Sequence, residues 1–134
     1  MRNIYYKSGY KYQLSETYST STNIHPVDDV LTDYIDLFAD GHIVIRKGYA
    51  WDGPSGPTID TKNFMRGSLV HDAIYGLMRQ GLLKKDNRGA ADLLLRRMCK
   101  EDGMSSIRAW WVYRGVRLGG GSAVSNRKKV LTAP

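Results

Sequence analysis

The chain has 134 residues, of which 42% are hydrophobic and 25% are charged, a composition typical of one globular domain. It contains no run of about eighteen apolar residues, so the sequence predicts no transmembrane segment. A single cysteine, Cys99, excludes a disulfide scaffold, and its place within a helical pattern predicts a buried thiol. The first residues show no apolar stretch followed by a cleavage site, so we expect no signal peptide.

The chain is basic, with 20 Lys and Arg residues against 13 Asp and Glu residues and a formal net charge of +7. Such an excess favours an acidic partner surface, including phospholipid. Much of the basic excess lies on two predicted helices and in the last segment of the chain. They do not alternate with aromatic residues along a strand, and no zinc-finger or recognition-helix motif is present. Nucleic acid is therefore not the expected partner.

The first third of the chain is predicted to form antiparallel β structure. The segment YKYQLSETYSTST at residues 10–22 is rich in Tyr and Thr with rough alternation. Residues 33–51 contain two further strand-like runs joined by ADGH, where Asp40 and Gly41 fit a type I′ hairpin turn. The segment NIHPVDDVLT at residues 23–32 is interpreted as a connector, either irregular or with one short turn of helix. The two runs predict a hairpin whose buried face carries Ile35, Leu37, Ile43 and Ile45.

Three helices are predicted after a loop at residues 51–63, WDGPSGPTIDTKN, in which no periodicity is visible. Apolar residues recur at helical spacing from Phe64 to Met78, and the pattern ends at Gly81. Further helices are predicted over residues 85–101 and 105–118, and residues 120–134 are predicted to be a flexible basic tail. The expected fold class is α+β, with a small antiparallel β element packed on three helices in one domain of residues 1–119.

Polar residues interrupt the apolar faces of the first two predicted helices. His71 and Tyr75 are four residues apart and share one face, and Asp92 lies among apolar residues of the next helix. Antiparallel packing of the two helices would bring Asp92 close to His71, an arrangement that can activate water. A structural interpretation stays open, in which His71 is a hydrogen-bonded core residue and Asp92 pairs with a nearby arginine.

The loop segment GYAWDGPSG provides Asp52 and several backbone carbonyl groups. Asp72 is rotated by about 100 degrees from His71 on the predicted helix, so it faces a different neighbour. Oxygen-rich irregular loops bind Ca²⁺ when a second carboxylate approaches. Asp52 and Asp72 are therefore candidate calcium ligands, and a plain surface loop is the alternative.

Four segments of the chain, GYAWDGPSG, RGSLVHDAIYGLM, NRGAADLLLRRM and YRGVRLGG, resemble domain of unknown function 1353, a family encoded by phages and prophages. The resemblance covers residues 39–119, and its most specific parts are an HD-x-x-Y helix and an R-x-x-AD helix. Many members carry a T-D-x-A-S-x-P-R loop where this chain has AWDGPSGPTID, so only Asp52 is carried over from the loop. The resemblance implies a phage-encoded protein located in the host cytoplasm or in the virion.

The order of a W-D-G loop, an HD-x-x-Y helix and a helix with a buried Asp is also similar to secretory phospholipase A₂. In that family the loop carbonyls and the Asp after the catalytic His hold Ca²⁺, while the His activates water. This similarity implies His71 as general base, oriented by Tyr75 and Asp92, with Asp52 and Asp72 on calcium. The chain departs from that family in having one cysteine where the secretory enzymes depend on disulfides.

These observations predict a hydrolytic site that cleaves an ester with the help of Ca²⁺, with a bilayer or another acylated surface as substrate. The alternative is a non-catalytic phage protein, either a virion or tail component that contacts phage structural proteins or an inhibitor that contacts a host defence protein. In that alternative the His-Asp-Tyr set is a buried network that determines how the helices pack.

Overall fold

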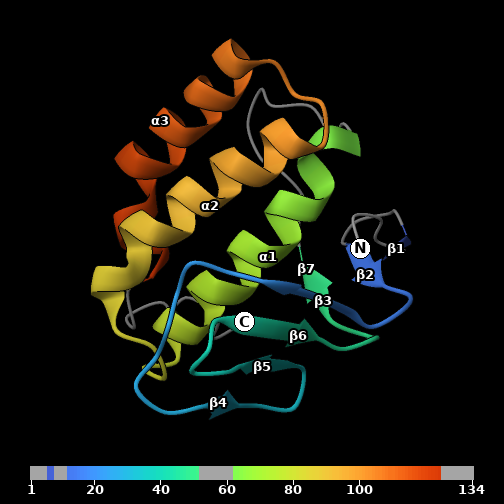
Figure 1. Cartoon of the computed structure of the whole chain (residues 1–134), viewed down its shortest axis with the longest axis vertical. Coiled ribbons are helices and arrows are strands. Elements are labelled where there is room, and N and C mark those ends of the chain that lie inside the picture. Colours follow the sequence, from blue (N-terminus) through green and yellow to red (C-terminus); the bar gives the residue numbers. More distant parts are fainter. Residues whose placement is uncertain (1–5, 8–11, 52–61, 125–134) are drawn as a thin grey trace, which may run out of the picture.

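The computed structural model describes residues 6–7, 12–51 and 62–124. Strands occupy the N-terminal part and helices the C-terminal part, so the predicted α+β class is confirmed (Figure 1). The expected loop after Trp51 and the last ten residues of the predicted tail lie outside the described residues. Among the described residues, no helix is both long enough and apolar enough to cross a bilayer.

A four-stranded antiparallel sheet has the order β3-β6-β5-β4, formed by β3 (Tyr18–Ser21), β6 (His42–Ile45), β5 (Ile35–Leu37) and β4 (Val30–Leu31). The register pairs Leu37 with Ile43, so the alternating apolar side chains share one face and are buried as predicted. The connector forms the short strand β4, which corrects the expected turn of helix.

The turn between β5 and β6 differs from the predicted type I′ turn. A type I′ turn needs positive φ at both central residues, whereas among the described residues only glycines have positive φ, and Gly41 has φ of 95°. The Phe38 carbonyl accepts from the Gly41 N–H at 2.8 Å, and the Phe38 N–H donates to the His42 carbonyl at 2.9 Å. The connection is therefore a wider turn that ends at Gly41, whose backbone has a left-handed conformation.

A second sheet has the order β1-β2-β7, formed by β1 (Tyr6–Lys7), β2 (Tyr12–Leu14) and β7 (Ala50–Trp51). Trp51 is buried, and its Nε1 donates to Ser68 Oγ at 3.0 Å. This bond joins the end of β7 to the first long helix, so the residues just before the candidate calcium loop lie against that helix.

The helices are α1 (Lys62–Arg79), the short 3₁₀ helix η1 (Lys85–Asn87), α2 (Arg88–Glu101) and α3 (Ser106–Ala123). Figure 1 shows α1 between the strands and α2, with α3 on the outer side of α2. Gly67 lets α1 and α2 approach closely, because a Cβ there would lie 3.0 Å from Leu95 Cδ1. The predicted helix ends at Gly81 and Gly103 are confirmed, and both glycines have positive φ.

The third helix continues through the glycine run instead of ending at Leu118, and Val124 just beyond it is buried in the core. Glycine is a poor helix former, so local propensity predicted a flexible segment here. Contacts of α3 with the other helices outweigh the low helix propensity of these glycines.

Arg66, near the start of α1, is buried and ties three elements together. Its Nη1 donates to the Tyr18 hydroxyl at 2.9 Å, its Nε to Asp102 at 2.9 Å and its Nη2 to Glu101 at 2.7 Å. Burial would lower the pKa of Arg66, but the hydrogen bonds to Asp102 and Tyr18 raise it, so the guanidinium stays charged. One side chain thus joins β3, α1 and the end of α2.

We expect Arg66→Ala to lower the free energy of unfolding by about 3 kcal/mol, because it removes one partner of a buried ion pair. Arg97→Ala is the matched control, since Arg97 pairs with the same Glu101 at 3.4 Å but is half exposed, and its loss is expected to cost less than about 1 kcal/mol. Urea unfolding of both variants measures the difference. Equal losses would contradict the role of Arg66.

Candidate functional site

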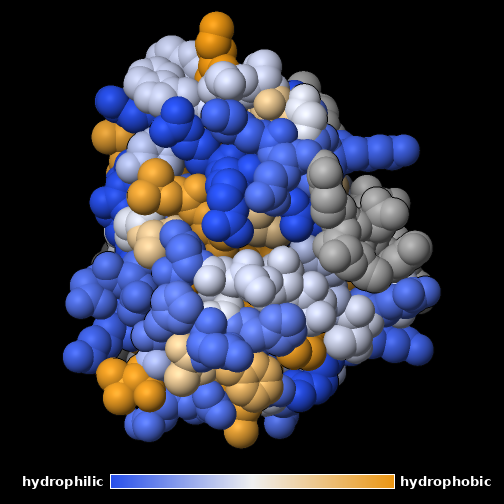
Figure 2. Space-filling model, viewed as in Figure 1, coloured by the Kyte–Doolittle hydropathy of each residue, from blue (hydrophilic) through white to orange (hydrophobic). Residues whose placement is uncertain are grey.

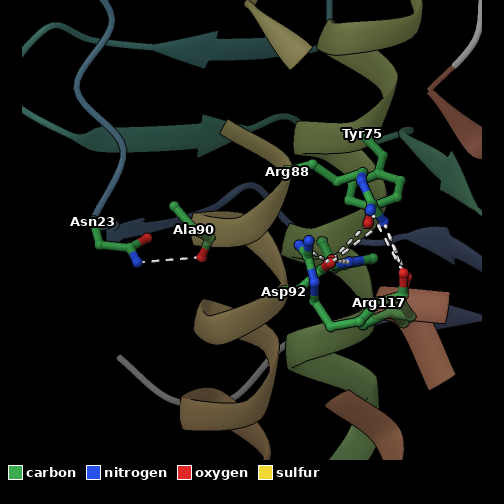
Figure 3. Close-up of polar contacts among 8 residues, drawn as sticks. Asn23, Tyr75, Arg88, Ala90, Asp92 and Arg117 are labelled. Carbon is green, nitrogen blue, oxygen red and sulfur yellow. Dashed lines mark hydrogen bonds and ion pairs between the residues drawn. The ribbon is translucent and has the colours of Figure 1, made fainter. Parts of the chain in front are cut away.

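The candidate site is centred on the carboxylate of Asp92, which is 0% exposed. Its Oδ1 accepts from His71 Nε2 at 2.7 Å and from the Tyr75 hydroxyl at 2.6 Å. Its Oδ2 accepts from Arg117 Nη1 at 3.0 Å and lies 3.7 Å from Arg88 Nη1. Figure 3 shows Tyr75, Arg88 and Arg117 gathered around Asp92. Helix α1 provides His71 and Tyr75, α2 provides Asp92 and Arg88, and α3 provides Arg117.

Helical spacing places most of these side chains. His71 and Tyr75 are four residues apart on α1, and their rings are in contact with centroids 4.1 Å apart and planes tilted by 36°. Arg88 is four residues before Asp92 on α2, so both face the same side. Arg88 also donates to the carbonyl oxygens of Val116 at 3.2 Å and Arg117 at 3.4 Å, which holds α3 against the site.

The hydrogen bonds determine which groups carry protons. Burial would raise the pKa of Asp92, but the hydrogen bonds from His71 and Tyr75 outweigh this effect and lower it, so the carboxylate is ionised at neutral pH. Burial, followed by the bond to Asp92, raises the pKa of Tyr75, so the phenol keeps its proton. Because an ionised carboxylate only accepts, the His71 Nε2 carries a hydrogen, and the neutral form of the ring has its lone pair on Nδ1.

The second ring nitrogen of His71, Nδ1, makes no hydrogen bond to the residues that the structure describes. The His71 side chain is 13% exposed, so part of the side chain reaches the surface. The ring thus has one nitrogen anchored to a buried carboxylate and the other without a protein partner among those residues.

Asp72 faces a different neighbour, as its position on the helix predicted. Its Oδ2 accepts from the Tyr49 hydroxyl at 2.5 Å, and Tyr49 lies immediately before β7. Burial, followed by the charge of Asp72, raises the pKa of Tyr49, so this phenol also remains a donor. Asp72 therefore points toward the chain segment that leads into the candidate calcium loop.

A calcium site is only partly represented in the described residues. Asp72 supplies one hard oxygen donor, which suits Ca²⁺, but the ion takes six to eight oxygen ligands. The described ranges contain no group of three or more His, Cys, Asp or Glu side chains that could hold a metal ion. Asp52 and the loop carbonyls lie outside those ranges, so the described residues alone do not form the site.

Sequence spacing predicted that His71 and Tyr75 share one face and that Asp92 lies close to His71, and the geometry confirms both. The resemblance to secretory phospholipase A₂ implied that Tyr75 belongs to the same group, and its hydroxyl donates to Asp92. Of the two arginines near Asp92 on the same helix, Arg88 pairs with it, whereas Arg96 lies over the Tyr113 ring at 5.7 Å from its centroid. Two partners were not foreseen: Arg117, which reaches Asp92, and Tyr49, which binds Asp72. Both contacts depend on how distant elements pack against the site, which the spacing of residues within one segment does not determine.

Cys99 is a free, buried thiol, as predicted. Burial is the main cause that raises its pKa to about 12. A protonated thiol is a weak nucleophile, so Cys99 has no part in the candidate site.

Gly120 allows α3 to approach the site. A Cβ at this position would collide with the Tyr75 hydroxyl and would lie 2.7 Å from Arg88 Nη1, whereas a Cβ at Gly121 would meet nothing within 4 Å. We expect Gly120→Ala to be less stable than Gly121→Ala by about 1–3 kcal/mol, because both gain the same helix propensity and only the first is overpacked. Chemical denaturation measures the difference, and equal stability would contradict this close approach.

Comparisons with known proteins support a family assignment only. A family model described as a protein of unknown function, DUF1353, matches residues 29–116. Searches of curated proteins and of solved structures find no match. The matched range includes β4 to β7, α1, α2 and most of α3, and it therefore contains His71, Asp72, Tyr75 and Asp92. The chain belongs to the DUF1353 family.

Proposed function

We propose that this protein is a hydrolase of carboxylic esters in which His71 acts as general base. The observation that carries the proposal is the bond between His71 Nε2 and the buried Asp92 carboxylate, on a His71 side chain that is 13% exposed. A histidine anchored in this way keeps one tautomer and one ring orientation, which are the requirements for a general base.

The proposed step begins with a water molecule hydrogen-bonded to His71 Nδ1. As its proton passes to Nδ1, the water oxygen attacks the ester carbonyl carbon and a tetrahedral intermediate forms. The intermediate collapses when the bond to the leaving alkoxide oxygen breaks, and Nδ1 returns the proton to that oxygen. The products are a carboxylic acid and an alcohol. Asp92 remains ionised throughout and stabilises the imidazolium, while Tyr75 holds the carboxylate in place.

Calcium is part of this proposal, with Asp72 and Asp52 as its carboxylate ligands. A bound Ca²⁺ would stabilise the negative charge that develops on the ester carbonyl oxygen. The position of Asp72, next to His71 in the chain and bonded to Tyr49 beside the loop, supports this assignment. A bilayer or another acylated surface is the proposed source of the ester.

A second candidate function is favoured by the number of donors on Asp92. Four side chains from three helices surround this carboxylate, and two of them are arginines. Such a network also suits a non-catalytic phage protein, either a virion or tail component or an inhibitor of a host protein, in which the polar groups only fix helix packing. The two functions differ in what the loss of His71 does.

We expect His71→Gln to lower ester hydrolysis by about 100-fold or more while the protein stays folded, because glutamine can still donate to Asp92 but cannot act as a base. Fatty-acid release from phospholipid vesicles and hydrolysis of short-chain nitrophenyl esters measure activity, and circular dichroism measures folding. His42→Gln on β6 is the matched control and should leave activity unchanged. A wild-type protein without hydrolysis, combined with a His71→Gln variant that loses about 1–3 kcal/mol of stability, would support the structural role instead.

Calcium titration calorimetry tests the metal part of the proposal separately. We expect the wild type to release or absorb heat on binding Ca²⁺ and Asp72→Asn to show none, because the variant loses a charged oxygen ligand. Asp86→Asn, in the exposed helix η1, is the control and should bind as the wild type does. Absence of heat with the wild type would remove calcium from the mechanism and leave the role of His71 to the activity measurement.

A further inference from the structure

Helix α3 carries an exposed apolar stripe along its outer face. Ile107 is 73% exposed, Trp110 38%, Trp111 63% and Leu118 79%. Together with Arg114, these residues follow the spacing of a single helix face. The Arg114 guanidinium lies over the Trp110 ring, 5.3 Å from its centroid, so the cation and the aromatic residues form one surface. We call this set of five residues the α3 stripe.

The α3 stripe makes no contribution to the core. The opposite face of the helix packs on α2 through Ala109, Val112 and Val116. Figure 1 places α3 on the outside of the helical layer, and Figure 2 shows orange and pale side chains along the top and left edge of the molecule, where α3 begins. Exposed aromatic and aliphatic residues in one row are unusual on a surface without a partner.

The segment of the sequence that contains the stripe carries charge of one sign. Residues 104–134 contain no Asp or Glu, and they contain six basic residues: Arg108, Arg114, Arg117, Arg127, Lys128 and Lys129. This segment therefore carries +6 of the formal net charge of +7. A partner that covers the stripe therefore has to bind tryptophan and leucine side chains and has to carry dense negative charge.

We propose that the α3 stripe docks on the surface of an anionic phospholipid bilayer. Tryptophan rings favour the boundary between headgroups and acyl chains, and an amphipathic helix with arginines on its flanks lies in that plane. Basic residues near an anionic bilayer strengthen such binding by electrostatic attraction. Charge of a single sign over 31 residues suits the uniform charge of a lipid surface better than the mixed charge of a typical protein partner.

The docking helix is also connected to the candidate site, because Arg117 of α3 donates to Asp92. If the proposed ester hydrolysis is correct, the stripe holds the enzyme on its phospholipid substrate. This last link rests on the proposed function, whereas docking itself does not require any catalysis.

The test is binding to vesicles of phosphatidylglycerol or of phosphatidylcholine, in buffer with a chelator so that calcium bridges are absent. Sedimentation measures the bound fraction, and tryptophan emission reports insertion, since Trp51 is buried and the change in emission comes from the two tryptophans of α3. We expect binding to phosphatidylglycerol, a shift of emission to shorter wavelength and weaker binding at high salt.

The variant that removes the stripe is Ile107→Ser combined with Trp111→Ser, and we expect its affinity for phosphatidylglycerol vesicles to fall by about tenfold or more. Val27→Ser combined with Leu31→Ser removes two strongly exposed apolar residues near β4, on the sheet side of the molecule, and should bind as the wild type does. His71→Gln should also bind normally, which separates docking from the proposed catalysis.

Three results would overturn the docking proposal. The first is equal binding to both lipids, and the second is unchanged binding of the α3 double variant. The third is a wild-type dimer in light scattering that the same double variant converts to a monomer, because the stripe would then be an interface between two copies of the chain. Normal vesicle binding without any hydrolysis would leave docking intact and remove only the proposed enzyme function.

Discussion

The arrangement of the helices depends on one buried charge, the carboxylate of Asp92. Removing an ionised group from water costs several kcal/mol unless hydrogen-bond donors and opposite charges replace the solvent. Here the hydrogen-bond donors come from α1 and α3, and Arg88 of α2 adds a positive charge 3.7 Å from Oδ2, so the helices are held where these groups reach the same carboxylate. A buried, fully satisfied carboxylate therefore selects one helix arrangement among the many that apolar packing alone would allow.

A second polar centre holds the opposite end of the same helix pair. Arg66 at the start of α1 binds Glu101 and Asp102 at the end of α2, and it also reaches Tyr18 on β3. The antiparallel pair of α1 and α2 is thus fixed by ionic contacts at two levels, with apolar side chains between them. Polar contacts therefore hold α1 on both sides of the apolar contacts, which suits a site on this helix that needs a defined geometry.

The same contacts serve stability and the proposed chemistry. Hydrogen bonding to Asp92 through Nε2 fixes the His71 ring, and the neighbouring Asp72 turns toward Tyr49 and the segment before β7. Helix α3 takes part in both functions that we propose, since its inner face supplies Arg117 to Asp92 and its outer face carries the α3 stripe. Family membership adds a framework for these residues without assigning an activity to them.

Periodicity alone determined a large part of this protein: the α+β class, the hairpin of β5 and β6, the helix ends at Gly81 and Gly103, and the meeting of His71 and Tyr75 with Asp92. These features depend on residues that are close in sequence or on two helices joined by a short connection, so local spacing encodes them. Only the tertiary structure decided that Arg117 reaches Asp92, that Tyr49 binds Asp72, and that α3 continues through its glycines, where close contact with Tyr75 and Arg88 requires a residue without a side chain. Each of these features depends on how elements that are distant in sequence pack together. That packing is determined by apolar contacts and buried charges across the whole fold, so no single segment of the sequence encodes it.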